Sequence, residues 1–203
     1  AIGRDLEAPV HAVLNAALPA PSSDLTLNIG AEYQIALSGA ADADGTRSLP
    51  VKIRAGQHVS DTFYVQGLYV GSGSLYLGYG SSYTYERASA TVSNTSIVFK
   101  EEGQTLSNGA ISILTVTPVL TPPATTTLSP LTVRGGANPI VVNVTSSNPA
   151  VLSVLTPQVV LSPGMSEVAV KAKGVGVGSA TLQLSAGNYD VSQPKSSIKV
   201  VIQ

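Results

Sequence analysis

Two aspartates one residue apart are the closest approach to a metal site in this sequence. Asp42 and Asp44 lie in the polar segment ADADGTR (41–47), directly before Gly45. Alternate aspartates ahead of a glycine resemble the front of a calcium loop, because a tight turn aims both carboxylates at one hard cation. A calcium site needs about six oxygen ligands, and no closing glutamate follows at the expected distance. We therefore expect no cofactor, with Ca²⁺ at Asp42 and Asp44 as the single metal hypothesis and an Asx-type turn as its alternative.

The residue types that catalyse reactions do not form a recognisable pattern. The two histidines, His11 and His58, fall in separate segments without a zinc-binding spacing, and the chain has no cysteine. The glycine-rich segment GVGVGSA (174–180) is followed by the strand-like SATLQLS, whereas a phosphate loop needs a helix at that point. These observations predict that the protein is not an enzyme.

Tyrosines form the most distinctive cluster. Six of the eight lie in residues 61–86, together with five of the nineteen glycines. Alternation in the strands expected at 59–66 and 73–79 directs Tyr64 and Tyr76 outward, and neighbouring antiparallel strands would bring these two side chains together. The candidate interaction surface consists of Tyr64, Tyr69, Tyr76, Tyr79 and Tyr85.

Three interpretations of this tyrosine surface remain open. Tyrosine suits the outside of any β-sheet, so the surface can be structurally ordinary. Tyrosine with glycine is also a composition enriched at protein interfaces, which favours contact with another repeat or another copy. The third interpretation is a platform on which sugar rings stack.

The elements that position these residues are predicted to be β-strands. Val, Leu, Ile, Thr, Ser and Gly dominate the sequence, while the charged residues that usually cover helices make up only 11% of it. The net charge of −1 is spread evenly, so no basic patch for nucleic acid is expected. No run of 18 apolar residues exists, so we expect no membrane insertion, and we interpret APVHAVLNAALPA (8–20) as mature sequence rather than a signal.

An internal repeat organises the strands. Val51 and Ile53 align with Val159 and Leu161, and Leu75 and Leu77 align with Leu182 and Leu184. The segments 25–29 and 140–144 align upstream, and 89–92 and 197–200 align downstream. The turns RAGQ (54–57) and SPGM (162–165) are predicted to close β-hairpins.

This repeat predicts two β-sandwich domains, at 1–97 and 119–203. Residues 98–118 have no counterpart in the first repeat and are predicted to form a junction, in which IVF (97–99) and ISILTVT (111–117) are the arms of a hairpin. The segment TPVLTPPATTTLSPL (117–131) favours an extended, stiff path.

The two repeats resemble bacterial immunoglobulin-like (Big-type) modules. The resemblance rests on IGRDLEAPVHAVLNAALPAPSSDLTLNI with VKIRAGQHVSDTFYVQGL in the first repeat, and on LTVRGGANPIVVNVTSSNPAVLSV with VLSPGMSEVAVKAKGVGVGSATLQLSAGNY in the second. It implies an all-β chain of two tandem immunoglobulin-like sandwiches from an adhesin-like or fibrous exported protein at the bacterial cell surface. Such motifs mark a fold and specify no activity.

We therefore expect a structural segment of an extracellular fibre, stalk or adhesin. Its partners would be neighbouring repeats or copies of the same protein, joined in one variant by β-strand addition through the N-terminal strand or residues 97–118. The alternative is a carbohydrate- or ligand-binding module that uses the tyrosine surface.

Overall fold

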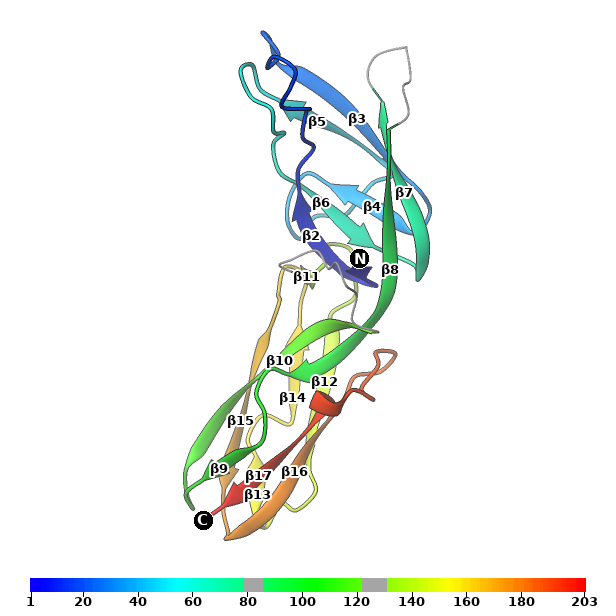
Figure 1. Ribbon diagram of the computed structural model, residues 1–203. Coiled ribbons are helices and arrows are strands. Elements are labelled where there is room, and N and C mark those ends of the chain that lie inside the picture. The colour runs from blue at the N-terminus through cyan, green and yellow to red at the C-terminus, as the bar shows by residue number, and fades with distance from the viewer. Residues whose placement is uncertain (79–85, 122–130) are drawn as a thin grey trace. The chain divides into compact units, whose positions relative to one another are not determined.

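The computed structural model describes residues 1–78, 86–121 and 131–203, whose regular elements are β-strands and one 3-10 turn at Pro194–Ser196 (Figure 1). The strands belong to two compact units. Unit 1 comprises Ala1–Ser93 and Ala124–Ala137, and unit 2 comprises Asn94–Pro123 and Asn138–Gln203. No helix within the described ranges has the length and apolarity that crossing a membrane requires.

Unit 1 is a sandwich of two sheets. One sheet has the order β5-β3-β7-β8, with β1 added parallel to β8, and the other has the order β11-β2-β6-β4. The strand bounds in unit 1 are β1 Ile2–Gly3, β2 Leu6–Val10, β3 Leu25–Ala31, β4 Ile35–Ser38, β5 Ser48–Ile53, β6 Phe63–Gly67, β7 Gly71–Gly78, the first part of β8 Glu86–Phe99, and β11 Thr132–Val133.

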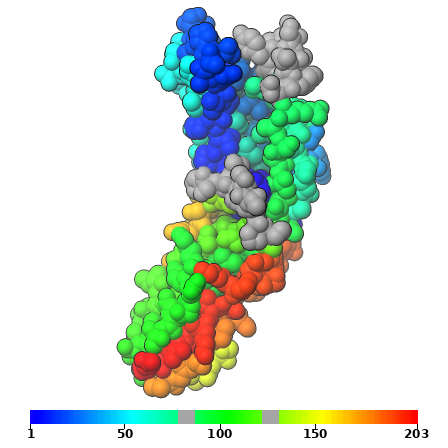
Figure 2. All heavy atoms as spheres, viewed as in Figure 1, coloured from blue at the N-terminus to red at the C-terminus, as the bar shows by residue number. Residues whose placement is uncertain are grey.

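Unit 2 has the same plan. One sheet has the order β13-β15-β10-β8, formed with the end of β8, and the other has the order β14-β12-β16-β17-β9. Its further strands are β9 Gln104–Leu106, β10 Ile111–Thr121, β12 Ile140–Ser146, β13 Leu152–Val154, β14 Gln158–Leu161, β15 Val168–Gly174, β16 Gly178–Ser185 and β17 Ser197–Ile202. In the space-filling view the green atoms of β9 lie beside the red atoms of β17, with which β9 pairs in parallel (Figure 2).

Both units are immunoglobulin-like sandwiches, and the all-β fold class predicted from the sequence is confirmed. In unit 1, β3 lies between β5 and β7, and in unit 2, β12 lies between β14 and β16. The strand that follows in sequence after β5 or β14 lies in the other sheet of its unit: β6 in unit 1 and β15 in unit 2. This pairing matches the internal repeat strand by strand.

Residues 98–118 have a different place from the one the sequence suggested. The strand β9 pairs parallel to β17 as β1 pairs parallel to β8, and β10 pairs with β15 as β2 pairs with β6. These residues therefore supply the first strands of unit 2 rather than a separate junction. The equivalence is hidden in the sequence because β10 alternates buried and exposed positions over 11 residues, whereas β2 is a five-residue strand without alternation.

The two predicted hairpins are also corrected. The turns exist, since Gln57 N donates to Arg54 O at 3.0 Å and Met165 N donates to Ser162 O at 3.0 Å. The strands on either side of each turn, however, lie in opposite sheets. Such a connection looks like a hairpin in sequence because both have alternating strands around a tight turn.

A fully buried carboxylate holds unit 1 together. The Glu7 side chain, at the second residue of β2, accepts hydrogen bonds from Asp42 N and Gln66 Nε2, both at 2.8 Å. Gly135 N donates to it at 3.3 Å, and the hydroxyl of Thr132 lies 3.5 Å from it. A charged group out of contact with water needs this number of donors, because isolated burial of a carboxylate is very unfavourable.

The segment at residues 131–137 connects β10 with β12 in the sequence, yet it belongs to unit 1. Thr132 and Val133 pair with Glu7 and Leu6, and Arg134 N donates to Asp5 O at 3.0 Å. An edge strand of unit 1 is thus supplied from between two strands of unit 2. The stiff path predicted for 117–131 falls largely at 122–130, outside the described residues.

Replacing Glu7 by Ala is predicted to destabilise unit 1 by roughly 2–4 kcal/mol, because two backbone amides and the Gln66 amide lose their buried acceptor. Urea unfolding combined with amide hydrogen exchange measures the change. The control is Glu167→Ala, which removes an exposed ion pair with Lys100 and should change stability little. Equal effects of the two substitutions would contradict the role of the Glu7 network.

Candidate functional site

Two stacked tyrosines form the most exposed aromatic feature among the described residues of unit 1. Tyr33 lies in the turn between β3 and β4, and Tyr69 lies in the connection between β6 and β7. Their rings are parallel within 1°, with centroids 4.4 Å apart. Although they cover each other, Tyr33 remains 61% exposed and Tyr69 49% exposed. Two ordered rings are therefore accessible to a ligand.

An arginine fixes one side of this stack. Arg47 Nη1 donates to the carbonyl oxygens of Glu32 and Ile35, both at 2.7 Å, which fixes the guanidinium group. Its Cζ lies 5.4 Å from the centroid of Tyr33, within cation–π range. A hydrogen bond with the Tyr69 side chain, assisted by desolvation, raises the pKa of Tyr33. Tyr33 is thus uncharged at neutral pH.

The Glu32 carboxylate continues the cluster toward β7. It accepts hydrogen bonds from the Tyr76 hydroxyl and, at 2.8 Å, from Ser74 N. The Tyr76 bond lowers the pKa of Glu32 and raises the pKa of Tyr76, because it stabilises the carboxylate and the neutral phenol together. The Arg87 Cζ lies 5.1 Å from the centroid of the Tyr76 ring.

We call Tyr33, Arg47, Tyr69, Tyr76 and Arg87 the aromatic surface. Glu32 links its two parts, because its backbone oxygen holds Arg47 while its carboxylate holds Tyr76. The surface can offer stacking faces and cationic edges.

The structure separates the tyrosines that the sequence placed together. Tyr69 and Tyr76 belong to the aromatic surface, but the expected contact of Tyr64 with Tyr76 is wrong. Tyr64 is half-buried on β6, where it pairs with Pro9 and Ser38 in the other sheet. Tyr79 and Tyr85 lie outside the described residues.

Sequence reasoning missed Tyr33 because it stands alone in the segment GAEYQI, away from the cluster at 61–86. A signal was nevertheless present in the repeat. The corresponding turn of unit 2, between β12 and β13, contains Asn148 and Pro149, which are ordinary turn residues. A bulky aromatic residue at such a turn is a departure that the fold does not require.

The acidic and histidine candidates have local structural contacts. Asp42 has a left-handed backbone, with φ of 57°, and its amide is bound by Glu7. Within residues 1–78, 86–121 and 131–203, no three Asp, Glu or His side chains gather into a metal-binding group. The Ca²⁺ hypothesis at Asp42 and Asp44 stays a prediction.

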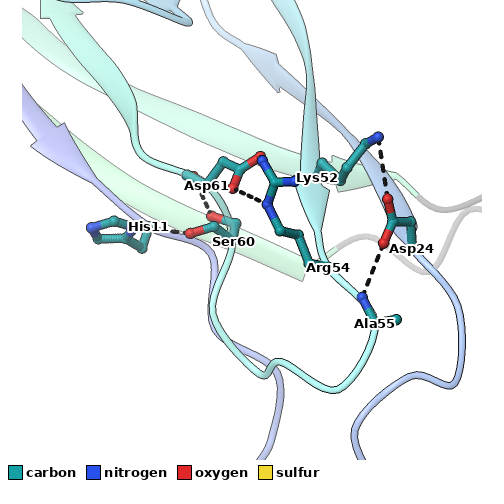
Figure 3. Close-up of polar contacts among 7 residues, drawn as sticks. All are labelled: His11, Asp24, Lys52, Arg54, Ala55, Ser60 and Asp61. Atoms are coloured by element: carbon teal, nitrogen blue, oxygen red, sulfur yellow. Dashed lines mark hydrogen bonds and ion pairs between the residues drawn. The ribbon is translucent and has the colours of Figure 1, made fainter.

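Each histidine bonds to a backbone carbonyl group of the segment that contains the other one. His11 Nδ1 lies 3.0 Å from Ser60 O, and His58 Nε2 lies 2.9 Å from Leu18 O. Beside Ser60, Asp61 forms a two-point ion pair with Arg54 across the turn that follows β5 (Figure 3). These contacts hold residues 58–61 against the segment that continues β2.

An apolar groove of about 490 Å³ opens between the two sheets of unit 1. Core residues of β3, β6 and β7 form its floor, and residues 10–14 and 87–90 form its rims. The floor comprises Leu27, Ile29, Phe63, Val65, Leu75 and Leu77.

No protein-family model matches this sequence, and no curated protein is significantly similar to it. Among solved structures, the chain is similar to domains 4 and 5 of the S-layer protein SbsC, with 22% identity, 68% of each chain covered and a TM-score of 0.36. It is also similar to the adhesin InvE of Yersinia pseudotuberculosis, with 13% identity, 100% of this chain and 56% of that chain covered, and a TM-score of 0.37.

A third similar structure is the D0-D1 domain of intimin, with 10% identity, 98% of this chain and 90% of that chain covered, and a TM-score of 0.33. The match to the longer SbsC structure rSbsC(31-844) covers 84% of this chain but only 20% of that chain, with 18% identity and a TM-score of 0.36. Similarities at this level assign no activity or partner to the chain.

Replacing Glu32 by Gln is predicted to lower the pKa of Tyr76 toward its ordinary value of about 10, because the neutral amide no longer opposes ionisation of the phenol. Carbon NMR of ring-labelled tyrosine follows this titration. The control is Glu167→Gln, which changes a carboxylate paired with Lys100 and should leave the Tyr76 titration unchanged. An unchanged Tyr76 titration would contradict the Glu32 contact.

Proposed function

We propose that this chain is a structural segment of a bacterial cell-surface protein, in which its two sandwiches space or join repeats and resist tension. The observation that carries the proposal is the parallel pairing of an early strand with a late strand in each unit. In unit 1, β1 pairs with β8, and in unit 2, β9 pairs with β17.

Two strands that pair in parallel resist a force that pulls on their opposite ends. When the two ends of a unit are drawn apart along such strands, all hydrogen bonds between them are loaded in shear and must break together. A terminal hairpin would instead open one bond at a time. Unit 2 reinforces its strand pair, because Gln203 N donates to Leu106 O and Asn108 N donates to Gln203 O, both at 2.9 Å.

The sequence supports an extracellular setting for such a segment. Both repeats resemble bacterial immunoglobulin-like modules, and the chain contains no cysteine, so these sandwiches depend on packing and hydrogen bonding alone. Stability then comes from the buried strands and from buried contacts such as those of Glu7.

Pulling the chain by its two ends in single-molecule force spectroscopy tests the proposal. A Cβ at Gly103 would lie 2.9 Å from Lys199 O, so Gly103→Ala pushes the start of β9 away from β17. We expect this substitution to lower the force at which unit 2 unfolds. Its thermodynamic cost should be about 1–3 kcal/mol, as for other overpacked sites.

The matched control is Gly176→Ala. A Cβ there would lie 2.8 Å from Ala150 O, a similar clash in unit 2 that does not touch the terminal strands. It should lower thermal stability comparably and leave the unfolding force nearly unchanged. The mechanical proposal fails if the unmodified chain extends at low force, or if the two variants weaken it equally.

The second candidate function is binding of carbohydrate, and the stacked pair Tyr33 and Tyr69 is the observation that favours it. Exposed, ordered rings cost little conformational entropy on binding, and Arg47 adds a charged edge beside them. Sugar C–H faces stack on such rings. This candidate uses Tyr69 and Tyr76 of the tyrosines predicted from sequence and leaves out Tyr64, which lies in the other sheet. Tyr79 and Tyr85 stay predictions.

An oligosaccharide array probed with the intact chain tests this candidate. If a sugar binds, Tyr33→Ala and Tyr69→Ala should each weaken its affinity by at least about tenfold, the effect of losing a central aromatic contact. Tyr64→Ala is the control, because Tyr64 lies in the other sheet. A blank array, or equal losses in all three variants, rejects the candidate.

A further inference from the structure

The apolar groove of unit 1 exposes residues whose counterparts in unit 2 are covered. Leu75 and Leu77 are only half-buried, whereas the aligned Leu182 and Leu184 are 0% and 6% exposed. The two units share the same strand plan, so this difference has a local cause. Something that covers the leucines in unit 2 has no equivalent among the described residues of unit 1.

Strand register identifies that cover. Val10 pairs with Phe63 in unit 1, and Leu114 pairs with the aligned Val170 in unit 2. Continuing both strands by two and four residues aligns Ala12 and Leu14 with Val116 and Pro118, which are buried in unit 2. Their neighbours there are Phe99 and Ile97, at the end of β8.

The end of β8 thus acts as the first strand of unit 2. Its Ile97 and Phe99 are fully buried, and Ser96 donates to the Asp190 carboxylate at 2.7 Å. That bond, with further donors from Ser192, holds the pKa of Asp190 far below its usual range. In unit 2 a strand that runs on from a neighbouring sandwich is therefore part of the core.

Unit 1 has the edges that could receive such a strand. The amide of Leu14 and the carbonyl of Ala12 bond to residues 58–60, at 2.8 and 2.9 Å, so the peptide groups of Val13 point the other way in an extended chain. Val13 is 70% exposed. On the opposite rim, β1 pairs with β8 only at Val92 and Ser93.

We propose that the groove of unit 1 binds the last strand of an adjoining repeat where that strand extends beyond its own sandwich, as unit 2 binds the end of β8. The strand would lie antiparallel to residues 12–14 and place two large apolar side chains over Leu75 and Leu77. This inference rests on the proposed structural function and names the partner surface of unit 1.

Register also sets the position of the strand. Ile2 pairs with Val92 and Gln104 pairs with the aligned Val200, so Ala1 corresponds to Gly103. Residues 94–102, NTSIVFKEE, therefore have the length that leads from the groove into Ala1. Joining this peptide directly ahead of Ala1 supplies unit 1 with a strand of the required chemistry.

The test compares amide hydrogen exchange of residues 86–91 in the chain with and without this extension. We expect exchange to slow by at least about tenfold, because the extension covers the groove and stabilises β8 locally. The control extension has Asp in place of the residues copied from Ile97 and Phe99, and it should give no protection.

A blocked groove provides the second measurement. Ala88 is exposed, lines the groove and pairs with Leu75, so Ala88→Trp should fill the groove without disturbing the fold. In this variant the extension should no longer protect residues 86–91. The proposal is overturned if neither extension slows exchange, or if both extensions slow it equally. It is also overturned if the protection persists in Ala88→Trp.

Failure here is distinguishable from failure of the mechanical function. The force measurement depends on β9 and β17 of unit 2, whereas the exchange measurement depends on the groove of unit 1. If the chain resists force but the extension does not slow exchange, the structural function stands and only this partner surface is rejected.

Discussion

The buried carboxylate of Glu7 is the interaction on which the organisation of unit 1 depends. One anion collects donors from the loop at residue 42, from β6 and from the segment at 132–135. A hydrophobic contact could tolerate sliding of these segments, but a buried charge cannot, because each lost donor leaves it less solvated. The carboxylate therefore specifies which piece of chain forms the edge strand beside β2. Gly135 fits this place because a Cβ there would lie 2.1 Å from Ala43 O.

The segments of the two units alternate along the chain. β8 begins in unit 1 and ends in unit 2, and the connection from β10 to β12 supplies β11 to unit 1. The polypeptide passes between the units three times instead of once. Neither unit therefore has all its strands from one continuous segment of the chain.

The sequence predicted the fold well where alternation and turns repeat, and poorly where strands change partners. The alignments of 51–53 with 159–161 and of 75–77 with 182–184 identify equivalent strands correctly, because buried positions must recur when a plan is repeated. Residues 104–121 were harder to place, because β10 and its counterpart β2 differ in length and pattern. The site was only partly predictable. Tyr69 and Tyr76 stood in a visible cluster, whereas Tyr33 and Arg47 join them through turns that composition does not reveal.

Comparison of the two units also separates what the fold needs from what it does not. The leucines at 75 and 77 are needed, since unit 2 buries the same positions, and their partial exposure in unit 1 marks an uncovered core. Tyr76 is not needed, since unit 2 has the exposed Gln183 at the aligned position. The strand β7 therefore has two different faces. Its inner face is apolar, like that of β16 in unit 2, and its outer face is aromatic and is not constrained by packing. A repeat built this way can vary its outer face without loss of the fold.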